Sequence, residues 1–81
     1  MTGKEKLLNK FFAYPQSLKY REIEFLLLEN GFQKIEAKGS HKKFKHNLLS
    51  KDLIIPIHNN DCKIFYKKYA KKLLKSLCNL K

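Results

Sequence analysis

Two histidines in the lysine-rich second half of the chain, His41 and His58, are the side chains best suited to chemistry on a phosphodiester. An imidazole titrates near neutral pH, so it can accept a proton from an attacking 2′-hydroxyl or donate one to a leaving 5′-oxygen. Nearby lysines can stabilise the charge that develops on phosphorus. Such a reaction needs no metal, and its use of a 2′-hydroxyl makes RNA the substrate. Because an exposed histidine in a basic strand is more often only solvated, the residues alone leave catalysis open.

Strand alternation decides where these histidines point. Residues 32–37 and 41–46 are short β-compatible runs, and Lys38-Gly39-Ser40 between them predicts a hairpin turn. Phe44 suits the core, so its neighbours in the strand should face outward. The outward side chains are then His41, Lys43 and Lys45.

A third strand is predicted over residues 53–57, after the polar link around Ser50. Proline cannot donate to a strand ladder, so Pro56 belongs at a strand end or on a sheet edge. If the odd-numbered side chains face the core, the opposite side carries Ile54, Pro56 and His58. His58 would then join His41 on one face.

Helical patterns surround these strands. Residues 4–14 have helical apolar spacing and end at Pro15. Ser17 is the predicted N-cap of a second helix, which should end at Asn30-Gly31.

A last helix is predicted from about residue 62 to 77. Its candidate N-caps are Asn59, Asn60 and Asp61, and its apolar stripe is Tyr66, Tyr69, Ala70, Leu73 and Leu77. The fold class is therefore α+β: a helix, then an α-β-β-β-α domain with a three-stranded antiparallel sheet and helices on one face. The other face of the sheet is left open to solvent or a ligand.

The composition limits what such a chain can be. Its 81 residues allow one small domain, and 18 Lys plus Arg against 7 Asp plus Glu give a net charge of +11. Phosphate polyanions or an acidic protein are the natural partners. Arg21 is the one arginine, which favours diffuse attraction to a backbone over bidentate recognition of bases.

No metal site or cofactor is expected. The sequence has no C-x-x-C pair or H-E-x-x-H motif, and alternation sends His41 and His46 to opposite faces. Cys62 and Cys78 are 16 residues apart in one predicted helix, about 24 Å, which predicts reduced thiols. Without a membrane-spanning run or a secretion signal, a cytoplasmic location is expected.

The spaced combination of short motifs resembles the HicA family of bacterial toxins. These motifs are Gly31-Phe32 at a helix end, Lys38-Gly39-Ser40-His41 with Phe44 three residues on, and Ile55-Pro56-Ile57-His58 before the final helix. The resemblance covers about residues 17–78. It implies a small mRNA interferase with a double-stranded-RNA-binding-like fold, the toxin of a type II toxin-antitoxin pair. It also divides the chain into an N-terminal helical extension, 1–16, and a HicA-like domain, 17–81.

The resemblance further implies roles for individual residues and a partner. His41 would be the catalytic histidine, with Gly39 and Ser40 shaping the turn that presents it. His58 matches the P-x-H position, where it could act in proton transfer, cap the last helix or hold the strand end. A HicB-like antitoxin would cover the active site, and the toxin alone would be a monomer that enters a larger complex with the antitoxin.

Lysines provide the expected contacts to RNA phosphates. Together with Gly39 and Ser40, the predicted RNA-binding residues are Lys38, Lys42, Lys43 and Lys45. A second basic stripe in the last helix, either RNA-binding or solvated, comprises Lys63, Lys67, Lys71 and Lys75. Two other functions stay open: a non-catalytic RNA-binding module of the same fold, and a protein-interaction domain with an acidic partner. The link at residues 46–52 carries two unexplained leucines that could contact the core or a partner.

Overall fold

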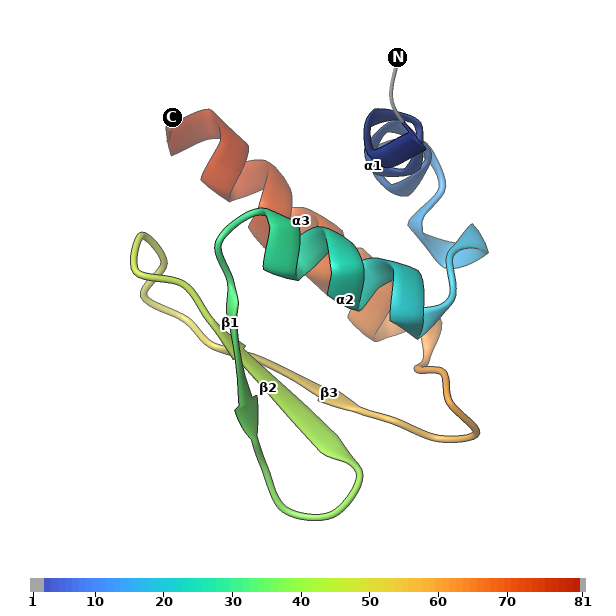
Figure 1. Ribbon diagram of the computed structural model, residues 1–81, viewed down its shortest axis with the longest axis vertical. Coiled ribbons are helices and arrows are strands. Elements are labelled where there is room, and N and C mark those ends of the chain that lie inside the picture. Colours follow the sequence, from blue (N-terminus) through green and yellow to red (C-terminus); the bar gives the residue numbers. More distant parts are fainter. Residues whose placement is uncertain (1–2, 81) are drawn as a thin grey trace.

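The protein is described by a computed structural model over residues 3–80. Its elements in chain order are α1 (Gly3–Ala13), the 3₁₀ turn η1 (Pro15–Ser17), α2 (Tyr20–Glu29), β1 (Gln33–Glu36), β2 (His41–Lys45), β3 (Leu53–Pro56) and α3 (Ile64–Leu80). After the first helix this is the predicted α-β-β-β-α order, so the α+β fold class is confirmed (Figure 1).

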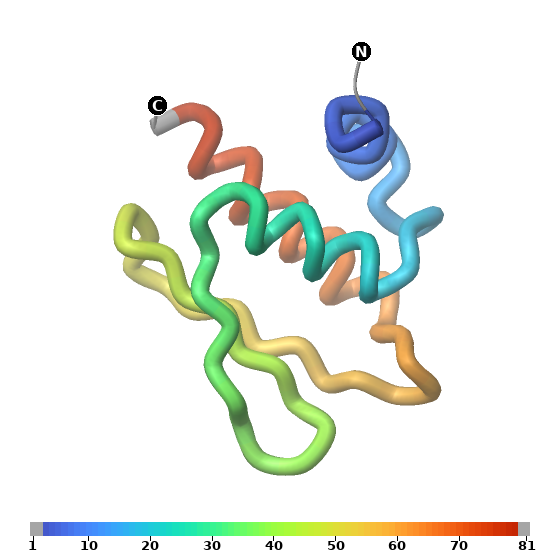
Figure 2. Tube along the Cα trace, in the orientation of Figure 1, coloured from blue at the N-terminus to red at the C-terminus, as the bar shows by residue number. Residues whose placement is uncertain are grey.

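The sheet is antiparallel with the strand order β1-β2-β3. Its register places His41 opposite Pro56 and Phe44 opposite Leu53. Figures 1 and 2 show α2 and α3 on the same side of the sheet, with the β1–β2 turn projecting away from them. Within residues 3–80, no helix covers the other face, which we call the open face.

The core forms where the two layers meet. Phe44, Leu53 and Ile55 are fully buried, whereas Ile54 between the last two is 48% exposed. This alternation is what a strand with one covered face requires. Fully burying one such side chain stabilises the fold by about 1.5–3 kcal/mol. The other fully buried core residues come from the helices and from the link before α2, and they are Phe11, Leu18, Ile23, Leu26, Leu27, Ala70, Leu74 and Leu77.

The N-terminal helix α1 packs on the helical layer. It contacts α2, α3 and η1, and its Phe11 is fully buried in the common core. The division of the chain at residue 16 stays a prediction.

Helix α2 begins differently from the prediction. Ser17 is not its N-cap: the Ser17 hydroxyl donates to the Tyr14 carbonyl at 2.7 Å within η1. The helix starts at Tyr20, and the Lys19 N–H is bound by the Glu22 carboxylate at 3.0 Å. Its predicted end is confirmed, because Gly31 has a φ of 92°, a left-handed conformation that favours glycine.

Helix α3 also starts later than predicted, at Ile64, and reaches Leu80. Asn59 and Asn60 have φ values of 54° and 63°, so they form the centre of a tight turn rather than cap the helix. Positive φ at both central positions is the pattern of a type I′ turn, in which asparagine is favoured. The carboxylate of Asp61 instead accepts a hydrogen bond from the first N–H of α2, at Tyr20, over 3.0 Å.

Candidate active site on the open face

His41 is the first residue of β2, and its side chain is exposed. Because Phe44 points into the core, alternation places His41 on the open face. Lys43 and Lys45 lie on the same face, so β2 presents one imidazole and two ammonium groups together. This is the face predicted from the sequence. Within residues 3–80, no hydrogen bond engages the His41 ring, which leaves both of its nitrogens open to a ligand.

The turn before His41 is fixed by its backbone. Gly39 has a φ of 64°, and the His41 N–H donates to the Lys38 carbonyl at 3.4 Å. A positive φ is a conformation that glycine adopts without a steric cost. The Ser40 carbonyl also accepts a hydrogen bond from the Ile57 N–H at 3.0 Å, which joins the turn to the end of β3. These contacts set the position from which the His41 side chain projects.

His58 lies beyond the end of β3, two residues after the cross-strand partner of His41. Its backbone makes a two-way bridge with Asp61: the His58 N–H donates to the Asp61 carbonyl at 2.7 Å, and the Asp61 N–H donates back at 3.1 Å. The His58 side chain is exposed and, by alternation, on the side of Pro56 and His41. Since α3 begins only at Ile64, His58 holds the strand end and does not cap the helix.

The predicted phosphate-binding lysines fall into two groups. Lys38 and Lys45 are exposed, and Lys43 forms an ion pair with Asp52 at 3.5 Å on the open face. Lys42 shares the inner side of β2 with Phe44 and is half-buried. The structure therefore brings three of the four lysines to the face or turn of His41 and sends Lys42 toward the helices.

The carboxylate of Glu24 on α2 lies on the same side of the sheet as Lys42, and both residues line one pocket. Glu24 accepts hydrogen bonds from Lys34 at 2.8 Å and from the Tyr20 hydroxyl at 2.9 Å. Partial burial alone would raise the pKa of Glu24, but these two hydrogen bonds and the charges of Lys34 and Lys42 lower it below its usual value. The positive charge of Lys42 thus favours the ionised carboxylate of Glu24.

His46 has a structural role. Its Nδ1 accepts the Leu48 N–H at 3.0 Å, so the network assigns the proton to Nε2, which lies 3.1 Å from the Asn30 carbonyl. Its ring also meets Phe32 edge-on, at a centroid distance of 5.0 Å. The link that follows is held in the same region, where Leu49 packs against the core while Leu48 is 57% exposed.

A comparison of the sequence with models of known protein families identifies the family of this chain. The sequence model of the family described as the HicA toxin of bacterial toxin-antitoxin systems matches residues 20–79 of the 81-residue chain. The chain belongs to the HicA toxin family. No curated protein and no solved structure matches it significantly. The matched HicA region contains the turn, His41, His58 and all three strands.

On the helical side of this HicA fold, a buried lysine of α3 connects the helix to two other segments of the chain. Lys67 of α3 is only 6% exposed, and its ammonium donates to the Leu18 carbonyl at 2.7 Å and lies 3.2 Å from Asp61 Oδ1. The stripe interpretation is wrong for Lys67, whose ammonium is neither solvated nor available to RNA. Its four-residue spacing from Lys63 and Lys71 gives no signal of burial, because both of its partners, Leu18 and Asp61, lie outside α3.

Asp61 is the centre of this contact. Its Oδ1 accepts the N–H groups of Tyr20 and Cys62, at 3.0 and 2.8 Å, in addition to the contact with Lys67. Partial burial opposes ionisation, but the hydrogen bonds from Cys62, Lys67 and Tyr20 outweigh it and lower the pKa of Asp61. The charged carboxylate therefore favours the folded state.

This lowered pKa predicts a pH-dependent stability. Because the pKa of Asp61 is lower in the folded state, its contribution is fully present above the unfolded value of about 4 and is lost as the pH falls through the folded value. We expect Asp61→Asn to be less stable than the wild type at neutral pH, and the difference to shrink in acid. Urea unfolding of both proteins from neutral to acidic pH measures this. A difference that is constant over the whole range contradicts the assignment.

We also looked among the described side chains for groups of metal ligands and for a reactive thiol. Across residues 3–80, no three His, Cys, Asp or Glu side chains are grouped so that they could hold a metal ion. Burial raises the pKa of the half-buried Cys62, which disfavours the thiolate needed for nucleophilic attack. In the same region, no helix is both long and apolar enough to cross a membrane.

Proposed function

We propose that this member of the HicA family is a metal-independent endoribonuclease that cleaves mRNA through His41 and thereby inhibits translation. The observation that carries the proposal is the exposed His41 on the open face, held by a glycine turn and accompanied by Lys43 and Lys45. An open sheet face with an unpartnered imidazole can accommodate an extended single strand, and the lysines provide contacts to its phosphates.

The reaction uses the 2′-hydroxyl of the RNA as the nucleophile. A ring nitrogen of His41 takes the hydroxyl proton as the 2′-oxygen attacks phosphorus, and the bond from phosphorus to the 5′-oxygen breaks. The leaving 5′-oxygen receives a proton from a second group, for which His58 on the same face is the candidate. The products are a 2′,3′-cyclic phosphate and a 5′-hydroxyl. Lys43 and Lys45 stabilise the negative charge on phosphorus in the transition state.

The expected partner is an antitoxin of the HicB type that covers the open face. A net charge of +11 attracts an acidic surface and accelerates the encounter between the two proteins. The toxin would act in the cytoplasm, where both mRNA and a newly made antitoxin are available.

Purified protein incubated with end-labelled single-stranded RNA in EDTA tests this function. We expect fragments that carry a 2′,3′-cyclic phosphate, which treatment with acid opens to a monophosphate. Fragments with 5′-phosphate ends would exclude attack by the 2′-hydroxyl. Salt-sensitive RNA binding without any cleavage would favour the non-catalytic RNA-binding module, and the absence of RNA binding would favour the protein-interaction domain.

A further inference from the structure

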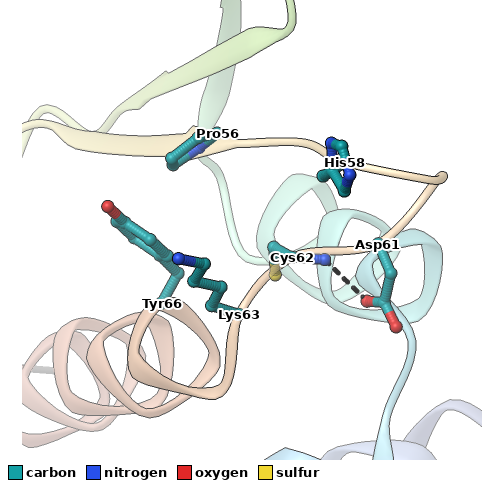
Figure 3. Close-up of a pocket in the computed structure, with 6 residues that line it drawn as sticks. All are labelled: Pro56, His58, Asp61, Cys62, Lys63 and Tyr66. Atoms are coloured by element: carbon teal, nitrogen blue, oxygen red, sulfur yellow. Dashed lines mark hydrogen bonds between the residues drawn. The ribbon is translucent and has the colours of Figure 1, made fainter.

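A cleft lies where the chain passes from β3 to α3, at the margin of the open face. Its lining residues are Pro56, His58, Asp61, Cys62, Lys63 and Tyr66. Figure 3 shows Pro56 and His58 on one side and Tyr66 and Lys63 on the other, with Cys62 between them. The cavity of about 350 Å³ falls within the size range of small-ligand sites.

The side chains of the cleft suit a flat aromatic ligand with polar edges. Pro56 and the ring of Tyr66 provide apolar walls, and His58 and Lys63 provide groups that can donate hydrogen bonds. The surface beside it is also aromatic, because Phe65 is 68% exposed and its ring lies 5.1 Å from that of Tyr66, edge-on. Aromatic rings next to cations are the combination with which proteins bind unpaired nucleobases.

The cleft adjoins His41. Pro56, one of its walls, is the direct cross-strand partner of His41, and such partners have Cβ atoms about 4.5–5.5 Å apart. The other strand residue of the cleft, His58, follows two residues later on the same side. Pro56 therefore connects the cleft to the strand position of His41.

We propose, on the basis of the ribonuclease function above, that this cleft is the subsite for one unpaired nucleobase next to the scissile phosphate. The base lies against the ring of Tyr66, and Lys63 contacts its polar edge. The cleft thus gives the enzyme a base preference at one position, which the diffuse charge of the lysines cannot provide.

Binding measurements in a background that cannot cleave test the subsite separately from catalysis. In the His41→Ala protein, the affinities for fluorescein-labelled short homopolymers of A, C and U are measured by anisotropy. We expect the three affinities to differ. Adding Tyr66→Leu should weaken the best of them by at least about fivefold and reduce the differences, because base stacking contributes roughly 1–3 kcal/mol. Tyr69→Leu is the matched control, since Tyr69 is also half-buried on α3 but does not line the cleft.

A second pair of variants tests the subsite without changing Tyr66, whose substitution could also disturb the packing of α3. Lys63→Gln is expected to reduce discrimination among the homopolymers, whereas Lys51→Gln, an exposed change of equal charge outside the cleft, should weaken all three equally. Equal affinities in the His41→Ala protein, or unchanged discrimination in both Tyr66→Leu and Lys63→Gln, would overturn the subsite. Wild-type cleavage in EDTA distinguishes the two proposals: cleavage without discrimination removes only the subsite, and discrimination without cleavage removes only the ribonuclease.

Discussion

Replacing His41 with alanine is expected to reduce the rate of RNA cleavage by about 10²–10⁴-fold, which is the usual contribution of a general acid or base. The variant keeps the strand, because His41 is exposed and within residues 3–80 no hydrogen bond to its ring is lost. The measurement is the initial rate of cleavage of end-labelled RNA in EDTA, with wild type and variant purified in parallel.

The affinity for RNA separates the loss of chemistry from the loss of binding. The lysines on the open face remain in the His41→Ala protein, so we expect its affinity for a non-cleavable 2′-O-methyl RNA to stay near that of the wild type. His58→Ala should reduce cleavage less, because water can replace it as a proton donor. Equal cleavage by wild type and His41→Ala would assign the activity to another residue or to a contaminant.

The second large effect is expected from the buried Lys67. Lys67→Met keeps a long side chain but leaves the Leu18 carbonyl buried without a donor and removes the cation beside Asp61. An unsatisfied buried polar group costs about 1–3 kcal/mol, and we expect a loss of stability of that size. Urea unfolding monitored by circular dichroism gives the difference in the free energy of unfolding.

Lys68→Met is the matched control for this change. Lys68 is the next residue of α3 and is exposed, so its substitution should alter stability by no more than about 0.5 kcal/mol. A similar effect of the two substitutions would mean that the contacts of Lys67 do not stabilise the fold.

The arrangement of the open face could be predicted from the sequence because it depends on local alternation. Phe44 identifies the inner side of β2, and the apolar residues of β3 identify the inner side of that strand, so the positions of His41 and His58 follow. Gly39 and the Asn30-Gly31 pair marked the turns correctly, because positive φ leaves few residue choices.

The errors concern residues whose partners are distant in sequence. The buried ammonium of Lys67 depends on a carbonyl 49 residues earlier, and no spacing within α3 indicates it. Ser17 has the residue type of an N-cap, yet the N-terminus of α2 is bound by Asp61, which is 41 residues from Tyr20. The cleft was missed for the same reason, since its walls come from β3 and α3 and meet only in the folded chain.

The contact centred on Asp61 has a consequence for the motions of the molecule. One carboxylate joins the start of α2, Cys62 after the Asn59–Asn60 turn, and Lys67 in the first turn of α3. We therefore expect these segments to open together as one cooperative unit. The β1–β2 turn lies outside that unit: its residues 38–41 are exposed, and solvent-exposed backbone hydrogen bonds open at a low free-energy cost. Amide hydrogen exchange should therefore be faster in this turn than in the helical layer. The segment that presents His41 can then adjust to an incoming strand while the core stays closed.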